Sequence, residues 1–507
     1  MTEQKKINAE QIKKWFKKEF SNDHASGYLP EERPPVWKLF LYAVQQVIVM
    51  FPATVLVALI TGFQVSTTVF ASGLATVCFI FITGKKVPLY YGSSFAYLTA
   101  VASLMSTEAI MAKLSPAALA QLELWQSGAI SVLPPEAISY AQFGIIMSGF
   151  VSIAAGLLIK FFGVKAVEKI LPPSITGSIA MIIGLTLAGN ALSDAAPNMA
   201  QMQAGTGWAV WVVSLATLLS TVLFSRYLKG IWGQLPLLLG AAVGCVLAGI
   251  ILGIGGEEYS LFRTIDKSLL LSASPAHTAN GIIAVPAFTF PKASAAAVVA
   301  IMPIAIATIP ESTAHMYQLD IYVKDVADKK GKKMKYNMIN KLWINLVGDG
   351  VCDMISGVVG GPAGTNYGEN ISTMAITKVF STSVLLLAGI LAMVISFFTP
   401  LIQGIYAIPL AVIGGLEIYL FGAIAAQGIA IMIDKKVDMF SAKNIAVIAS
   451  IMVIGIGGNY AFGGNIPFFG LDVPCIAGAA IFGIFLNLIL SIGDKSRKAK
   501  KEKAVEA

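Results

Sequence analysis

Ionisable residues inside long apolar stretches are the first candidates for chemistry in this sequence. Glu311 lies in IATIPESTAH and His315 follows four residues later, so the two side chains share one face of a helix. A charge at the centre of a membrane-spanning helix costs about 2.5–3.5 kcal/mol on insertion scales. The pair therefore predicts a binding site with Glu311 as a proton carrier; the alternative is a buried ion pair that only fixes packing.

A second polar stretch, TNYGENIST at residues 365–373, also lies between apolar runs long enough to cross a membrane. Its Glu369 either contacts a ligand or caps a helix start, and the two roles are compatible. Residues 91–95 read YGSSF and echo YGENI at residues 367–371. Both pentapeptides start an unusually short apolar segment. Such a pair in corresponding positions indicates the binding site of a transporter.

The chemistry of these segments suits a flat polar ligand. Carboxylates accept hydrogen bonds, and the free N–H groups at a helix start donate them. A planar heterocycle with ring N–H donors and carbonyl acceptors would satisfy both. A simple anion fits poorly beside two carboxylates, whereas a cation stays open as an alternative. Phe95 and Tyr367 offer flat contact surfaces, or they are packing residues.

Other buried polar residues have supporting roles in this interpretation. Asp349 and Asp353, in VGDGVCDM, and Glu417, in GGLEIYL, are expected to make helix–helix contacts. Asp349 is also a candidate to hold the second short segment in place. We expect Asn370 and Gln46 to support the same site.

The sequence predicts no metal site and no cofactor. Of its three histidines, His24 lies in the polar N-terminal stretch and His277 in a long loop, so His315 has no histidine partner within the membrane. The sequence has no HExxH and no nucleophile motif, which argues against a membrane enzyme. The paired short segments favour a transporter over a channel or a receptor.

The composition indicates a membrane protein. The chain has 507 residues, of which 56% are hydrophobic and 13% charged, and its mean hydropathy is +0.74. Soluble domains carry about 25% charged residues. The net charge of +8 does not suggest nucleic acid, because the basic residues cluster in short loops and at both ends, where they set topology.

We predict fourteen spans, with both termini in the cytoplasm because basic loops alternate with loops nearly free of Lys and Arg. Two halves of seven spans must have opposite orientations, which is an inverted repeat whose third and tenth segments are short and broken. The predicted ranges are 37–60, 66–83, 94–105, 141–162, 174–193, 207–225, 234–255, 295–317, 339–360, 370–380, 382–399, 408–430, 444–460 and 470–491.

Several motifs occur in an order that is typical of one transporter family. They are ERPPVWKLF, GSSFA, LPPSITGSIAMIIGLTLAG, GGPAGTNYGENISTMAITKVFST, and IPLAVIGG followed by DKKVDMFSAKN. These motifs resemble those of the nucleobase–ascorbate transporters (nucleobase:cation symporter-2), and the YGEN form resembles the bacterial uracil permeases most closely. The resemblance covers nearly the whole chain after residue 32.

The resemblance implies an all-α polytopic fold with a core domain and a gate domain, a homodimer formed through the gate domains, and a location in the bacterial inner membrane. The implied parts are cytoplasmic tails at 1–36 and 494–507, core segments 37–162 (spans 1–4) and 295–402 (spans 8–11), and gate segments 163–294 (spans 5–7 and an external loop) and 403–493 (spans 12–14).

The resemblance also implies proton-coupled uptake of a nucleobase, most closely uracil. Glu311 and Glu369 would then bind the ring. The backbone N–H groups of Phe95 and Gly368 would meet the ring carbonyls, and Tyr367 would line the pocket. The alternatives are a purine permease for xanthine or urate and a symporter coupled to Na⁺.

By the same resemblance, His315 would bond to Glu311. The chain departs from the family at several positions. Ser372 replaces a glycine of the signature, Ser312 replaces a histidine after the glutamate of the eighth span, and Gln46 replaces a histidine of the first span. Glu417 stands where a small or apolar residue is expected. These departures leave the transported base and the coupling ion open.

Overall fold

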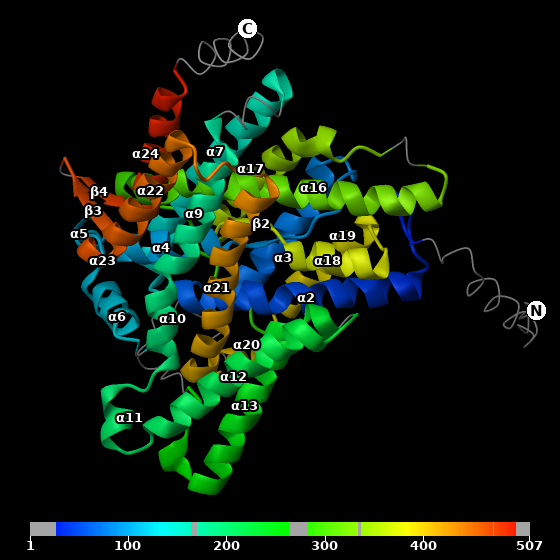
Figure 1. Cartoon of the computed structure of the whole chain (residues 1–507). Coiled ribbons are helices and arrows are strands. Elements are labelled where there is room, and N and C mark those ends of the chain that lie inside the picture. Colours follow the sequence, from blue (N-terminus) through cyan, green and yellow to red (C-terminus); the bar gives the residue numbers. More distant parts are fainter. Residues whose placement is uncertain are drawn as a thin grey trace, which may run out of the picture.

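The computed structural model describes residues 27–128, 130–163, 170–230, 232–263, 281–332, 336–469 and 471–492 (Figure 1). His24, His277 and the tail at 494–507 lie outside these residues, as do the first 26 residues of the predicted N-terminal tail. In the described part, ten helices are long and apolar enough to cross a membrane. The prediction of a helical, multi-pass membrane protein is therefore confirmed.

The first half of the chain contains eleven α-helices, one strand and three short 3₁₀ turns among the described residues. They are α2 (Val36–Thr61), α3 (Val65–Ile82), β1 (Tyr91–Ser93), η2 (Phe95–Tyr97), α4 (Leu98–Met105), α5 (Glu108–Met111), α6 (Pro116–Gln126), α7 (Pro135–Phe162), α9 (Pro173–Thr186), α10 (Ala188–Ala195), α11 (Met199–Gln203), α12 (Gly207–Tyr227), η3 (Trp232–Gln234), α13 (Pro236–Gly255) and η4 (Glu257–Tyr259).

The second half repeats the pattern of long helices interrupted by one short segment. Its elements are α15 (Ala295–Ile301), η6 (Met302–Ile304), α16 (Ala305–Lys329), η8 (Ile339–Lys341), α17 (Leu342–Val359), β2 (Gly364–Asn366), α18 (Gly368–Thr377), α19 (Thr382–Ile395), α20 (Thr399–Tyr406), α21 (Leu410–Asp434), α22 (Ala442–Met452), the π-helical η9 (Val453–Gly457), α23 (Gly458–Phe462), β3 (Asn465–Phe468), β4 (Leu471–Pro474) and α24 (Cys475–Leu490).

Two predicted boundaries were wrong. The eighth predicted span ends at residue 317, but α16 continues to Lys329. Ion pairs one turn apart, Lys324 with Asp320 at 2.6 Å and Lys329 with Asp325 at 2.5 Å, stabilise this polar extension, which hydropathy does not detect. The last predicted span begins at residue 470, but residues 471–474 form β4, which pairs with β3.

The inverted repeat is visible in the helix packing, because corresponding helices of the two halves each pack against a helix of the other half. Helix α3 packs on α19, and the corresponding helix of the second half, α17, packs on α7. Each contact is a close approach of two glycines. A Cβ on Gly73 would lie 2.4 Å from the carbonyl oxygen of Gly389, and a Cβ on Gly350 would lie 2.3 Å from that of Gly149. Helices α9 and α21, which correspond to each other, pack together directly.

The short third and tenth segments meet through two strands. β1 and β2 pair antiparallel, and each is followed after one residue by a helix start, at Phe95 and at Gly368. Phe95 and Gly368 are therefore equivalent. Tyr91 and Tyr367 are not, because Tyr91 begins β1 whereas Tyr367 follows β2. The echo of YGSSF and YGENI is thus out of register by three residues, although both segments are in the predicted place.

Asp353 holds the strand pair. Its carboxylate accepts hydrogen bonds from the hydroxyl of Tyr91 in β1 and from the N–H of Gly364 in β2, the latter at 2.8 Å. The hydroxyls of Ser72 and Thr76 in α3 donate to the carbonyl oxygen of Tyr91 at 2.8 and 3.0 Å. Asp353 therefore stabilises irregular backbone, which within a membrane must be bonded inside the protein. The expected helix–helix contact was wrong for this residue.

A second group of helices lies beside the group that carries the strands. Helices α9, α10, α12 and α13 pack with α21, and α22 and α24 pack with α9. In Figure 1, α12 and α13 extend below the strand-bearing group, and α22 and α24 lie on its left. The strand crossing, by contrast, is surrounded by α2, α3, α16 and α17.

Candidate functional site

Glu311 and His315 lie one turn apart on α16, and both are half-buried. Among the described residues, no hydrogen bond or ion pair joins them. The Nε2 atom of His315 lies instead against the start of α18, 2.9 Å from where a Cβ on Gly368 would be. Its Nδ1 atom is buried without a partner in the described part of the chain. His315 thus packs against the start of α18. The bond to Glu311 that the resemblance implied is not present among the described residues.

Glu369 lies in the first turn of α18, beside Gly368. Its side chain is exposed, although its neighbour Asn370 is fully buried. Glu311 and Glu369 are close enough to interact electrostatically. The structure therefore brings these two carboxylates together at an accessible position beside a helix N-terminus, where N–H groups lack partners within the helix.

Phe95 begins the other short helical segment and is half-buried. Because β1 and β2 are antiparallel, the helical segments that follow them run in opposite directions away from the crossing. The N–H groups of Phe95 and Gly368 consequently lie at the two ends of the same strand pair. The crossing therefore carries a helix start from each of the two repeats.

Tyr367 is buried within the strand crossing. Its hydroxyl donates to the carbonyl oxygen of Ser93 at 3.0 Å and lies 2.9 Å from the hydroxyl of Thr54. Its ring is stacked on Tyr90, with centroids 6.4 Å apart. Of the two roles that the sequence left open, ligand surface or packing, these contacts describe packing.

Asp349 is the acceptor of a buried polar network. One of its oxygens accepts from the hydroxyl of Ser312 at 2.5 Å, from the amide of Asn366 at 3.2 Å and from the amide of Asn345 at 3.4 Å. Asn366 ends β2 and also donates to Asn345 at 3.2 Å. The network therefore joins α16 and α17 to the strand that precedes α18, and Ser312 lies directly after Glu311.

Asn370 and Gln46 connect α18 to α2. The amide nitrogen of Asn370 donates to the side-chain oxygen of Gln46 at 2.7 Å and to its carbonyl oxygen at 3.0 Å. Both residues are buried. They support the helix start that carries Glu369 and do not face an open space.

Asn345 and Asn366 were not among the residues predicted from the sequence. A signal for Asn345 exists, because Asn345, Asp349 and Asp353 follow one another at intervals of four and so share one face of α17. The sequence contains no comparable signal for Asn366, because an asparagine before a helix is usually a cap or a turn residue.

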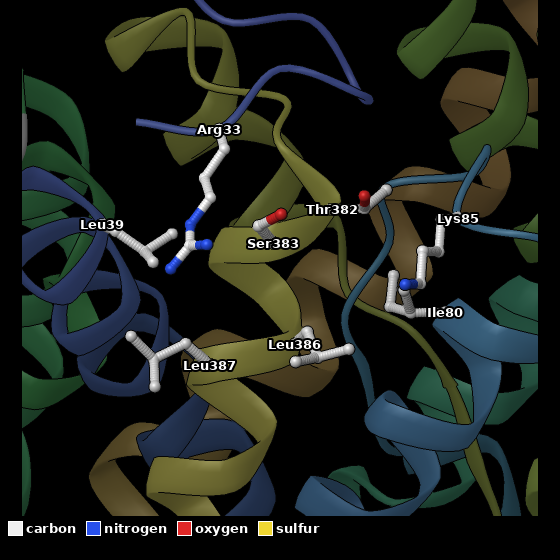
Figure 2. Close-up of a pocket in the computed structure, with 8 residues that line it drawn as sticks. All are labelled: Arg33, Leu39, Ile80, Lys85, Thr382, Ser383, Leu386 and Leu387. Atoms are coloured by element: carbon white, nitrogen blue, oxygen red, sulfur yellow. The ribbon is translucent and has the colours of Figure 1, made fainter. Parts of the chain in front are cut away.

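A pocket of about 290 Å³ lies elsewhere, between α2, α3 and α19 (Figure 2). Arg33 and Lys85 line it together with apolar side chains such as Leu386 and Leu387. It contains none of the residues predicted to bind a ligand. In the described residues no group of three or more His, Cys, Asp or Glu side chains could hold a metal ion.

A solved structure with a similar fold is the murine Solute Carrier 26 family member A9 anion transporter in the inward-facing state. The match has a TM-score of 0.60 at 13% identity and covers 94% of this chain and 75% of the transporter. At this identity the likeness concerns the fold alone.

Relatives in sequence are much closer. The chain is 32% identical to the uracil permease of Bacillus caldolyticus over 91% of this chain and 94% of the relative. It is 30% identical to the uracil permease of Escherichia coli (strain K12), over 91% and 93% of the two chains. The sequence model of the Permease family matches residues 37–464. The chain therefore belongs to this family of transporters, the nucleobase–ascorbate transporters whose motifs its sequence resembles.

Proposed function

We propose that this protein takes up uracil across the bacterial plasma membrane in symport with protons. The observation that carries the proposal is the pair of carboxylates, Glu311 and Glu369, beside the N-termini of two short helical segments at a strand crossing. The names of the relatives, uracil permeases at 30–32% identity over nine-tenths of both chains, support the choice of base.

Uracil matches this set of groups. Its ring has two N–H donors and two carbonyl acceptors. Glu369 and Glu311 would accept from the ring N–H groups, and the backbone N–H groups of Gly368 and Phe95 would donate to the carbonyl oxygens. Tyr367 is not in the proposed ligand set, because its hydroxyl already has protein partners.

Glu311 is the proposed proton carrier. It interacts with the carboxylates of Glu369 and Asp349, and the described residues provide no ion pair for it. Three negative charges in one partly buried site repel one another, so at least one proton is favoured there. Taking up this proton together with uracil would neutralise the site before the loaded segments move through the membrane.

The proposed movement is of one helix group against the other. The core would comprise residues 37–162 and 295–402, and the gate residues 163–294 and 403–493, with dimers formed through the gates and both termini in the cytoplasm. The grouping of α9, α12, α13 and α21 away from the strand crossing supports this division. Cross-linking of cysteines placed on the two groups, with and without uracil, would test it.

Uptake of labelled uracil into proteoliposomes, under an imposed proton gradient, tests the function. We expect Glu311→Gln to bind uracil but to lose accumulation against a gradient. We expect Glu369→Ala to lose binding, measured by calorimetry on the purified protein, while it still folds. Glu258→Gln, which changes an exposed carboxylate in η4, is the matched control.

Four outcomes would contradict the proposal. Proton-driven accumulation by Glu311→Gln with an unchanged pH dependence would exclude the carrier role. Unchanged affinity of Glu369→Ala would exclude the ligand role. Stronger competition by xanthine or urate than by unlabelled uracil, or uptake driven by a Na⁺ gradient alone, would establish one of the alternative transporters.

A further inference from the structure

A second pair of carboxyl groups lies outside the strand crossing, between α10 and α21. Glu417, on α21, is completely buried, and neither of its carboxylate oxygens has a hydrogen-bond donor among the described residues. The carboxyl group of Asp194, at the end of α10, lies within hydrogen-bonding reach of Glu417. Gly414, one turn before Glu417, fixes this approach: a Cβ there would lie 2.2 Å from the backbone nitrogen of Ala195.

Arg263 supplies one positive charge to this pair. Its guanidinium interacts electrostatically with Asp194 and donates to the hydroxyl of Ser131. Its backbone N–H donates to the carbonyl oxygen of Ala407 at 3.1 Å, just before α21. The Arg263 charge therefore acts on Asp194, although no ion pair joins the two side chains among the described residues.

The helices that pack on α21 add no further cation near Glu417. The sequence of α9 contains no ionisable side chain, and α13 contributes only Cys245. Helix α12 carries Arg226 and Tyr227, but at its last turn. Near Glu417, α12 contacts α21 through the helical turn that contains Ser214. The contact is close, because a Cβ on Gly415 would lie 2.5 Å from the carbonyl oxygen of Ser214. The phenol of Tyr406 also interacts electrostatically with Arg263.

An ionised Glu417 would thus be a buried charge with neither a donor nor a counter-ion of its own among the described residues. Leaving such a charge unpaired in a protein interior costs several kcal/mol, and a carboxyl group avoids that cost by keeping its proton. A protonated carboxyl group can donate to a neighbouring carboxylate in a short, charge-assisted hydrogen bond. The remaining negative charge is then shared with Arg263.

We propose that Glu417 and Asp194 bind one proton between them and form a second proton site, separate from Glu311 and Glu369. A metal cation suits the pair less well. The positive charge of Arg263 already acts on Asp194, and two carboxyl groups fall short of the six or so oxygen ligands that a hard cation takes. The proposal rests on these contacts and does not depend on which solute the protein carries.

Infrared difference spectroscopy on the full-length protein in lipid nanodiscs tests the site directly. At neutral pH, the spectrum of the unchanged protein minus that of Glu417→Gln is expected to contain the C=O stretch of a protonated carboxylic acid. Asp194→Asn should shift the same band. Asp434→Asn, which removes an exposed carboxylate at the end of α21, is the matched control and should leave the band unchanged.

Thermal unfolding gives a second measurement. If the folded protein holds a proton that the unfolded chain releases, its stability must fall as the pH rises. The Tm of the unchanged protein should therefore decline as the pH rises above the unfolded-state carboxyl pKa of about 4.3, and in Glu417→Gln, which mimics the protonated acid, this decline should become smaller. If Glu417→Gln does not fold, Asp194→Asn provides the same comparison.

The proposal is wrong if the difference spectrum contains only carboxylate bands, since Glu417 would then be ionised. It is also wrong if added Na⁺ replaces the acid band by carboxylate bands at constant pH, which would assign a cation site. Loss of uracil transport alone decides nothing about this proposal, so its failure and that of the proposed function remain distinguishable.

Discussion

Gly368 shows how a single missing side chain shapes the candidate site. It begins α18, directly before Glu369, and the Nε2 atom of His315 lies 2.9 Å from where a larger residue would place its Cβ. A ligand can reach the backbone N–H groups of a helix start only if no side chain blocks them. The position of the imidazole therefore depends on glycine here, and so would the ligand contact proposed for the Gly368 N–H.

We expect Gly368→Ala to weaken uracil binding at least about tenfold, or about 1.4 kcal/mol, because the added methyl group lies 2.9 Å from His315 and displaces it. Calorimetric titration of the purified variant measures this. Gly404→Ala in α20 is the control, since nothing lies within 4 Å of a Cβ at that glycine. Equal uracil affinities of the two variants would show that His315 can move aside without weakening uracil binding.

Three of the four departures from the family have identifiable partners in the structure. Ser312 donates to Asp349 within the polar network, and Gln46 accepts from Asn370. The hydroxyl of Ser312 and the amide of Gln46, which stand where the family has histidines, therefore both have hydrogen-bond partners. Glu417 is the third departure and forms the pair with Asp194. Nothing in the structure explains Ser372.

At the scale of elements, the segment before α2 is bound to the second half of the chain. The N–H of Tyr28 donates to the carbonyl oxygen of Lys378 at 2.8 Å, and the N–H of Phe380 donates back to Tyr28 at 2.8 Å. Glu32 forms an ion pair with Lys330 at 2.5 Å, beyond the end of α16. These contacts fasten α2 to the segment between α18 and α19 and to the polar extension of α16.

Glu32 gives this attachment a pH dependence. Burial alone would raise the pKa of its carboxyl group, but hydrogen bonds from Lys330 and the Leu29 N–H, with the Lys330 charge, outweigh burial and hold the pKa below its usual value. The contribution to stability is therefore complete above the unfolded-state pKa of about 4.3 and is lost as the pH falls through the lower folded-state pKa.

We expect Glu32→Gln to lower the free energy of unfolding by at most about 1 kcal/mol at neutral pH, since the pair is partly solvated. The difference in Tm from the unchanged protein should shrink as the pH falls below about 4.3 and through the lower folded-state pKa. Scanning fluorimetry at several pH values measures it, with the exposed Glu258→Gln as control. A difference in Tm that is constant with pH would mean that packing, not charge, is responsible.

At the scale of the whole molecule, glycine contacts set how closely the two halves interlock. Gly73 in α3 meets Gly389 in α19, and Gly350 in α17 meets Gly149 in α7, with carbonyl oxygens within 2.4 Å of the added Cβ positions. Side chains at these positions would push the helix pairs apart. The repeat is therefore conserved in its packing although the pentapeptide echo is out of register.

We expect Gly73→Ala and Gly350→Ala each to lower the free energy of unfolding by about 1–3 kcal/mol, the usual cost of overpacking. The two values should be similar because the two contacts are equivalent. Gly253→Ala in α13, where a Cβ meets nothing within 4 Å, should change little. A neutral effect at one site with a large effect at the other would show that the halves are not packed equivalently.

The sequence by itself determined the class of the protein, the places of the apolar segments, the family and the pairing of Glu311 with Glu369 as candidates. Hydropathy is a property of contiguous residues, and the cost of a buried charge identifies rare acids without knowledge of their neighbours. Only the tertiary structure decided the register of the strand crossing, the position of His315 against Gly368 and the contact of Glu417 with Asp194. Each of these depends on segments distant in sequence, because backbone and side-chain hydrogen bonds between them are fixed by packing and not by local pattern.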